Sequence, residues 1–416
     1  MIARIFLLTQ SPYTRHMASS VNADVMRSAG FEFIVLDTTD LLLPDLRGIH
    51  GELAAGEDVR RIANWDDLRE ISAQLTTNDV VVFWGAYYNR QLSEATPVYD
   101  IVSSSNALIG AVNSGHRPSH LAHSKDVGYF VTRLGRQLVD LISHPSEHGP
   151  KLVRRLTGST SLAFPSRSVS PSNAHLRRPL DYLWTGTMIA PVSQAIISAT
   201  THVRYIHTFE YEKMQHVQIR PLEECSQIVY LEGMGPRHPD YVVQGTNPYS
   251  ISSDKYDALI RRALTSIAKS SGCEVIIAAH PRAPRGSLEG RYGDYPVVYE
   301  ETARLIASAR VVVDAEGSTS VGMAAVANRP ILFLHSKGFG KVGYRFKKDF
   351  ARWLGAPILD IDSPLDKWSI PIVDEEAYAN YVRQFLRRQG SRSEPFWEQV
   401  LGDLGLDFAQ QDRTKS

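Results

Sequence analysis

Short apolar runs alternate with longer stretches of helical spacing along the first part of the chain. The run IARIFLLT at residues 2–9 precedes a helix-compatible stretch that ends at Gly30, and the run FEFIVLDTTD follows at residues 31–40. Glycine often follows the last turn of a helix, because it adopts the left-handed backbone without steric cost. A strand, a helix and a strand in this order are joined by a right-handed crossover, which makes the strands parallel. We therefore expect a parallel α/β sheet here.

The remainder of the first half is less regular. A helix, a strand, a long amphipathic helix and two strands are predicted in this order at residues 65–75, 79–85, 125–143, 180–187 and 201–212. Residues 106–115 fit either a strand or a buried helix, because so short an apolar run has no decisive period. Residues 146–178 are rich in Ser, Pro, Arg and Gly and predict irregular structure.

The second half repeats the α/β rhythm more clearly. Strands are expected at residues 227–233, 273–281, 296–300, 310–317 and 329–336, and helices at 253–272, 303–309 and 318–328. Two more helical patterns follow at 375–389 and 394–406, and no internal repeat is visible. The sequence thus predicts a second parallel α/β sheet.

A chain of 416 residues exceeds what one hydrophobic core usually supports. We expect an α/β protein with two Rossmann-like domains whose parallel sheets face a central cleft. The domains are predicted to be an acceptor domain at 1–215 and a nucleotide-sugar donor domain at 216–375. The helices of 376–416 are expected to pack back on the first domain and to end in a frayed tail.

Composition bears on nucleic-acid binding, cellular compartment and membrane insertion. The 45 basic and 45 acidic residues balance, so the overall charge does not attract nucleic acid. The two cysteines show no metal-ligand spacing and no disulfide framework, which favours a reducing cytoplasm. The N-terminus lacks the pattern of a signal peptide, and no apolar run approaches the roughly 20 residues that span a bilayer. We expect a cytoplasmic protein with at most peripheral membrane contact.

Two motifs at strand ends carry the chemistry. In VIIAAHPRAP, a buried strand is followed by His280, Pro281 and Arg282. Ligands of open α/β sheets bind beyond the carboxyl ends of the strands, so an imidazole and a guanidinium at this place indicate a site for an anion. A structural histidine and a solvated arginine are the alternative interpretation.

The second motif is VVVDAEGSTSVGMAAVANRP at residues 311–330. A strand delivers Asp314 and Glu316 to its end, Gly317 permits a tight turn, and three hydroxyl side chains are expected to open a helix, those of Ser318, Thr319 and Ser320. Hydroxyls and unpaired backbone N–H groups together suit a phosphate. An ordinary helix cap is the alternative.

Weaker signals lie nearby. Gly233 and Gly235 in LEGMG would let the backbone approach a ligand, although this is not the dinucleotide-binding glycine pattern. Glu301 and Thr302 cap the next predicted helix or bind the base or ribose of a nucleotide.

The order of HPR, ETARLI, VVVDAEGSTSVGMAA and PILFL resembles the C-terminal half of bacterial GT-B glycosyltransferases that build surface polysaccharides. The resemblance is notably to sialyltransferases and polysialyltransferases, with their HP and Ser-Ser/Thr motifs, and CDP-glycerol glycerophosphotransferases share a related pattern. The resemblance covers about residues 227–336. It implies that His280 and the hydroxyls of Ser318, Thr319 and Ser320 hold the phosphate of a cytidine-nucleotide donor. The lead-in DAEG departs from the families' usual sequence.

The resemblance implies a metal-independent transfer of a sugar from a CMP- or UDP-linked donor, with inversion, to a surface polysaccharide or glycolipid. Fixed donors would stabilise the leaving phosphate, and no acidic pair has metal-site spacing. The nucleotide sugar is a co-substrate, so no cofactor and no metal is expected.

The acceptor needs a general base, expected from the N-terminal domain. The candidates are Asp37, which alternatively caps a turn, and Glu210, which alternatively pairs with His207. Residues that could contact the acceptor, or equally serve as helix start and core, are Arg15, His16, Trp84 and Tyr87.

Three other functions remain open at this stage. They are a UDP-N-acetylglucosamine 2-epimerase-like enzyme, a CDP-glycerol-type glycerophosphotransferase and a non-catalytic nucleotide-binding module. Nucleic-acid binding is disfavoured, because basic residues such as the arginines at 154–155 and 177–178 form scattered pairs without interleaved aromatic residues.

Overall fold

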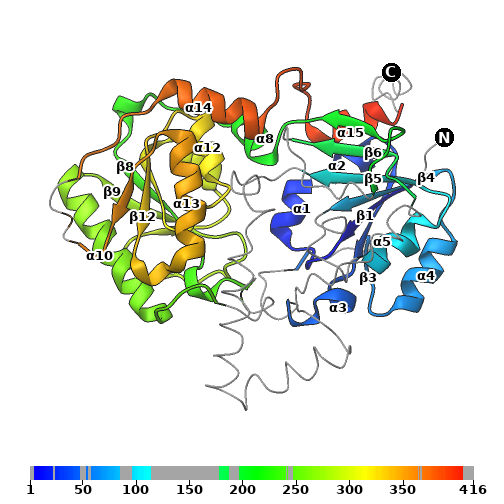
Figure 1. The fold of residues 1–416 in the computed structure, drawn as a ribbon, viewed down its shortest axis with the longest axis horizontal. Coiled ribbons are helices and arrows are strands. Elements are labelled where there is room, and N and C mark those ends of the chain that lie inside the picture. The colour runs from blue at the N-terminus through cyan, green and yellow to red at the C-terminus, as the bar shows by residue number, and fades with distance from the viewer. Residues whose placement is uncertain are drawn as a thin grey trace, which may run out of the picture.

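The computed structural model contains two parallel β-sheets joined through a short helix (Figure 1). It describes residues 4–21, 24–46, 53–54, 58–84, 96–113, 178–186, 196–239, 241, 247–363, 365 and 368–405. The predicted long helix at 125–143 and the predicted irregular segment up to residue 177 lie outside these residues.

The first sheet has seven strands in the order β3-β2-β1-β4-β5-β6-β7. All neighbouring strands are parallel. The strands are β1 Arg4–Thr9, β2 Glu32–Asp37, β3 Val59–Arg61, β4 Asp79–Trp84, β5 Leu108–Asn113, β6 Tyr182–Thr185 and β7 His202–Tyr205. The helices of this half are α1 Arg15–Val21, α2 Asp24–Ser28, α3 Thr39–Leu42, α4 Trp65–Ala73 and α5 Thr96–Ser103. The ambiguous run at 106–115 thus contains strand β5, which is paired between β4 and β6.

The second sheet has six strands in the order β10-β9-β8-β11-β12-β13, again all parallel. The strands are β8 Gln227–Leu231, β9 Glu274–Ala278, β10 Val297–Val298, β11 Ala309–Asp314, β12 Ile331–His335 and β13 Ile358–Asp360. The helices are α10 Ser253–Ser271, α11 Thr302–Ala307, α12 Val321–Val326, α13 Gly340–Leu354 and α14 Glu375–Tyr381, which continues as a π-helical turn over Val382–Leu386.

Both sheets run outward in two directions from their first strand, which is the Rossmann strand order. The direction of winding reverses between β1 and β4 in one sheet and between β8 and β11 in the other. Apolar clusters cover both faces of each sheet, as parallel sheets require. The predicted fold class, α/β with two Rossmann-like parallel sheets, is confirmed.

Helix α10 shows how local sequence sets an element. Its N-cap Ser252 accepts a hydrogen bond from the Lys255 N–H at 3.3 Å, and it ends at Gly272, whose φ is +68°. Its buried side chains recur at helical spacing and face the sheet, at Tyr256, Ile260, Ala263, Leu264 and Ile267.

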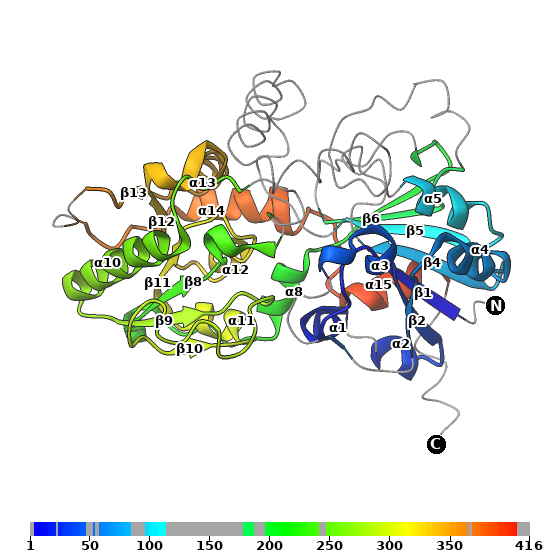
Figure 2. The same cartoon turned by 90° about the horizontal axis from the view of Figure 1, so that it is seen from below.

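The chain crosses between the two halves twice. On the first crossing lies helix α8, Phe209–Gln215, which stands between the halves in both views (Figures 1 and 2). Phe209 packs in an apolar cluster of the first sheet, whereas Met214 packs in a cluster of the second. On the second crossing the chain returns to helix α15, Phe396–Asp403, whose Trp397 packs against Phe33 of β2.

The two crossings are bonded to each other. The Thr208 N–H donates to the Leu386 carbonyl at 2.8 Å, and the Arg387 guanidinium donates to the Tyr211 hydroxyl at 2.8 Å. Helix α8 is therefore fixed to the return segment as well as to both cores. None of the helices in the described ranges is long and apolar enough to cross a membrane.

Candidate functional site

The loops after β8, β9 and β11 lie side by side at the carboxyl edge of the second sheet. Leu231 of β8 is paired with Ala278 of β9 on one side and with Asp314 of β11 on the other. Neighbouring strands lie about 4.8 Å apart, so the loops after β9 and β11 begin roughly 10 Å apart on the same edge. The histidine turn and the hydroxyl turn are therefore neighbours, separated only by the loop after β8.

Asp314 builds the turn after β11. Its side chain is fully buried, and its carboxylate accepts hydrogen bonds from the N–H groups of Gly317 at 2.6 Å and of Glu316 and Ser318 at 3.3 Å. Gly317 has a φ of +74°, which glycine adopts most readily. The expectation that several unpaired N–H groups face a phosphate here is wrong for these three, because Asp314 already binds them.

The three hydroxyl residues precede helix α12 instead of opening it. The helix starts at Val321, and the Ser320 side chain at its N-cap makes no capping hydrogen bond. The Ser318 hydroxyl accepts the Ser320 N–H at 3.2 Å. All three side chains, those of Ser318, Thr319 and Ser320, are partly exposed, so they remain accessible to a ligand.

Thr319 connects this turn to helix α8, because its side chain hydrogen-bonds the Glu210 carboxylate. Burial raises the pKa of Glu210, and hydrogen bonds together with the nearby charge of Lys213 partly offset the rise. Burial likewise lowers the pKa of Lys213. His207 pairs with Glu212 at 2.9 Å, which is not the expected alternative partner, Glu210. A buried carboxyl group of helix α8 thus lies against the hydroxyl turn.

Glu316 closes the space between β8 and β11. Its Oε1 accepts the Gly235 N–H and the Tyr256 hydroxyl, each at 2.7 Å. Burial raises its pKa to about 8, and the charges of Glu232 and Asp314 add to the rise. Both glycines of the LEGMG motif face this arrangement, since a Cβ at Gly233 would meet Glu316 and one at Gly235 would meet the Tyr256 ring.

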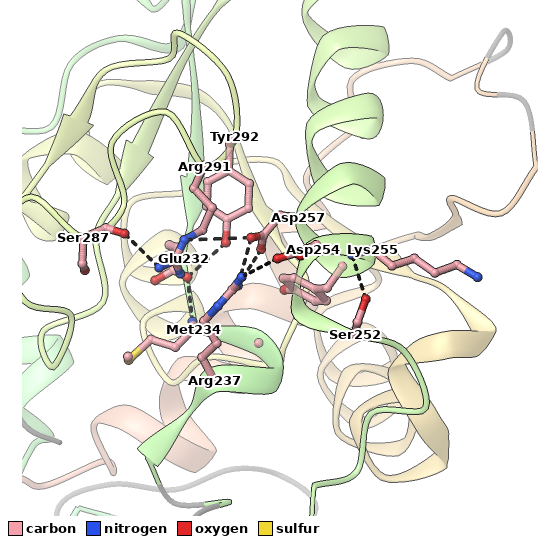
Figure 3. Close-up of polar contacts among 12 residues, drawn as sticks. Glu232, Met234, Arg237, Ser252, Asp254, Lys255, Asp257, Ser287, Arg291 and Tyr292 are labelled. Atoms are coloured by element: carbon pink, nitrogen blue, oxygen red, sulfur yellow. Dashed lines mark hydrogen bonds and ion pairs between the residues drawn. The ribbon is translucent and has the colours of Figure 1, made fainter.

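Glu232 anchors the other side of the β8 loop, as Figure 3 shows. Its Oε1 accepts the Met234 N–H at 2.9 Å and the Tyr292 hydroxyl at 3.1 Å. Burial raises its pKa, and these bonds, Arg291 and the His280 backbone partly offset the effect. On the same loop, Arg237 is ion-paired with Asp257 at 2.9 Å (Figure 3). The loop after β8 is thus held by buried carboxylates.

His280 is partly exposed at the start of the β9 loop, with Pro281 and Arg282 after it. Its Nδ1 accepts the Arg282 backbone N–H at 3.1 Å. A neutral imidazole that accepts at Nδ1 carries its proton at Nε2, so Nε2 is the donor. Its ring contacts the ring of His238, with the centroids 5.2 Å apart.

Lys347 of α13 is a site residue that the sequence did not predict. Its side chain is fully buried, and its Nζ donates to the carbonyls of Ala315 and Leu334, each at 2.7 Å. Burial lowers its pKa to about 8 despite the charges of Asp314 and Glu316. Lys347 therefore ties the carboxyl ends of β11 and β12 together.

Glu301 and Thr302 lie at the start of α11, beyond β10 at the edge of the sheet. Glu301 is the N-cap residue, but its side chain makes no capping bond and pairs instead with Arg304. This position is three strands away from β11 in the strand order.

Two candidates of the first half, Asp37 and Trp84, make contacts within the protein. Asp37 is buried at the end of β2, where its carboxylate accepts the N–H and hydroxyl of Thr39 at 3.0 and 2.6 Å. Asp37 thus caps a turn, which is the alternative to its role as a general base. Trp84, at the end of β4, packs against Phe209 of α8 with ring centroids 4.8 Å apart.

Arg15 is exposed at the start of α1. His16 is the next residue of that helix, and its side chain lies outside the described part of the structure, as does Tyr87 entirely. Within the described ranges, no group of three or more His, Cys, Asp or Glu side chains could hold a metal ion.

Neither a protein-family model nor a curated protein matches the sequence. Solved structures resemble the chain over most of its length at low identity. They include UDP-GlcNAc 2-epimerase from Methanocaldococcus jannaschii (12% identity, 92% of this chain and 99% of the other, TM-score 0.40). MurG from Acinetobacter baumannii (11%, 97% and 98%, 0.42) and Os79 from O. sativa in complex with UDP (11%, 91% and 90%, 0.42) are others. At this identity, the activities remain those of the named proteins.

Proposed function

We propose that the protein is a metal-independent glycosyltransferase of the GT-B type that uses a nucleotide sugar. The observation that carries the proposal is the position of His280 and of the three hydroxyls on the loops after β9 and β11, at one carboxyl edge of the sheet. These loops flank the point where the winding of the sheet reverses, which is where ligands of such sheets bind. The resemblance of residues 227–336 to surface-polysaccharide glycosyltransferases points to the same edge.

The chemistry requires stabilisation of the leaving phosphate. Sugar transfer develops negative charge on that phosphate, and fixed donors bind it more strongly in the transition state than in the ground state. The Nε2–H of His280 and the hydroxyls of Ser318 and Ser320 supply such donors from two loops. Arg282, partly exposed beside His280, adds a positive charge.

Glu210 is the general base in this proposal. Burial raises its pKa, which makes its carboxylate a stronger base than an exposed one, and it hydrogen-bonds Thr319 of the hydroxyl turn. Asp37 is a weaker candidate, because its carboxylate is committed to Thr39 and to the Tyr13 N–H.

The resemblance also indicates the substrates. The donor is a CMP-linked acidic sugar such as sialic acid, or a UDP-linked sugar, and the acceptor is a surface polysaccharide or a glycolipid. Transfer is expected to invert the anomeric centre, in the cytoplasm, with peripheral membrane contact at most.

Nucleotide binding tests the proposal. The thermal midpoint is measured with CMP, CDP, UDP, GDP and ADP for the parent, for His280→Ala, and for His216→Ala as an exposed histidine control. One nucleotide should raise the midpoint of the parent and of His216→Ala, and much less that of His280→Ala. If no nucleotide raises the thermal midpoint of the parent, or if the midpoint of His280→Ala rises equally, the proposed donor site is wrong.

Product analysis separates the other functions. A transferase slowly releases free nucleotide from the donor in the absence of acceptor, and a glycerophosphotransferase releases CMP from CDP-glycerol. An epimerase returns an intact nucleotide sugar of changed configuration, whereas a binding module changes nothing.

A further inference from the structure

His-Pro dipeptides occur three times in the sequence, at 144–145, 238–239 and 280–281, and the last two lie on neighbouring loops of the second sheet. His238 and Pro239 follow β8, as His280 and Pro281 follow β9, and the two strands are paired in parallel. The imidazole rings meet edge to face, with centroids 5.2 Å apart and an interplanar angle of 77°. Two histidines from different loops therefore share one place at the carboxyl edge.

The backbone of His238 is held in a defined conformation. A proline restricts the residue before it to extended backbone, and His238 has φ −60° and ψ 129°. The turn that precedes it is fixed by Glu232, which binds the Met234 N–H, and by Glu316, which binds the Gly235 N–H. The imidazole is thus presented by a loop with little freedom.

Several donors of this loop hold it in place. The N–H groups of Met234 and Gly235 bind buried carboxylates, and the Arg237 guanidinium is ion-paired with Asp257 and Asp254. His238 is partly exposed and contacts His280. In the strand order β9-β8-β11, its loop also stands between His280 and the hydroxyl turn.

We propose that His238 binds the phosphate of the nucleotide together with His280, an inference that rests on the proposed function. A phosphate has several acceptor oxygens and accepts N–H donors from two sides. A phosphate that spans the loops after β9 and β11 passes the loop after β8, and His238 is the side chain that meets it there.

The test compares nucleotides with their nucleosides. Dissociation constants of CMP, UDP, cytidine and uridine are measured by calorimetry for the parent, His238→Ala, His238→Gln, His280→Ala and the control His216→Ala. His238→Ala should bind the preferred nucleotide about ten- to a hundredfold more weakly, the loss expected for one hydrogen bond to a charged group. Its affinity for the matching nucleoside should change by less than about twofold, because the lost contact is to the phosphate. His238→Gln, which keeps an N–H donor, should recover part of the affinity.

The possible failures are distinguishable. If His280→Ala loses nucleotide affinity and both His238 variants bind like the parent, the role of His238 is refuted and the proposed function stands. Equal losses for nucleotide and nucleoside in a His238 variant would also refute it, since they indicate a loop-packing role. If the parent binds neither nucleotide, both the inference and the proposed donor site fail.

Discussion

The carboxylate of Glu316 fills the space beside Gly233, where a Cβ at residue 233 would lie 2.6 Å from its Oε2. The Glu316 side chain thereby fills the space between the loops that follow β8 and β11. The Glu316 carboxylate thus occupies the space beside Gly233 that the absence of a side chain leaves open. Residue 233 must therefore be a glycine, because a side chain there would collide with the Glu316 carboxylate.

Gly233→Ala should therefore destabilise the fold. An extra methyl group in this close-packed position costs about 1–3 kcal/mol, because Glu316 is held by Gly235 and Tyr256 and cannot withdraw freely. Urea unfolding measures the loss. Gly343→Ala in α13 is the control, since nothing lies within 4 Å of its added Cβ, and it should be neutral or stabilising by up to about 1 kcal/mol. Equal stability of Gly233→Ala and the parent would contradict the packing.

Glu316 should also make stability fall with rising pH. Its folded pKa of about 8 lies above the ordinary value of 4.5, so between these two values the folded state holds a proton that the unfolded state has released. Stability decreases wherever the folded state binds more protons, here from about pH 4.5 to about pH 8. Glu316→Gln should flatten the decline of the thermal midpoint over this window, and Glu70→Gln, exposed on α4, should not. Parallel profiles of Glu316→Gln and the parent would rule the assignment out.

Removal of the Lys347 ammonium should weaken the same edge. Lys347→Met loses two hydrogen bonds to carbonyls at the ends of β11 and β12 and leaves Asp314 and Glu316 without a nearby positive charge. We expect a loss of at least about 2 kcal/mol in the free energy of unfolding. Lys348→Met, at the exposed next residue, should change it by no more than about 0.5 kcal/mol. Similar losses in the two variants would argue against the role of Lys347.

Glu210→Gln should separate catalysis from binding. The amide keeps an acceptor for Thr319 but takes up no proton, so the transfer rate should fall by about 10² to 10⁴ while nucleotide affinity is retained. Asp37→Asn should behave differently, losing stability through its bonds to Thr39 while the turnover of the folded protein persists. Full turnover in Glu210→Gln would show that another residue is the general base.

Much of the fold could be predicted from the sequence. The β-branched run at residues 311–313 and the alternation of strands with helices identify both parallel sheets. Helix α13 was missed, because its glycines at 340 and 343 and its many cations hide the apolar side that contacts β12. The short strand β13 was missed with it, and so was Lys347.

The site was predictable where chemistry follows strand ends. The motif positions place His280 and Ser318 at one edge, whereas the binding of three N–H groups by Asp314 depends on a turn geometry that spacing does not reveal. His238 had a visible signal, since its His-Pro dipeptide repeats that of His280. Only the packing of the two rings shows that the dipeptides belong together.

The proposed donor site requires that the loops after β9 and β11 hold one phosphate. A crystal structure of the complex with the nucleotide that most stabilises the parent tests this most directly. A phosphate oxygen should lie within about 3 Å of the His280 ring nitrogen and another within about 3 Å of a hydroxyl of residues 318–320. A phosphate that contacts only one of these loops, or lies elsewhere on the chain, would contradict it.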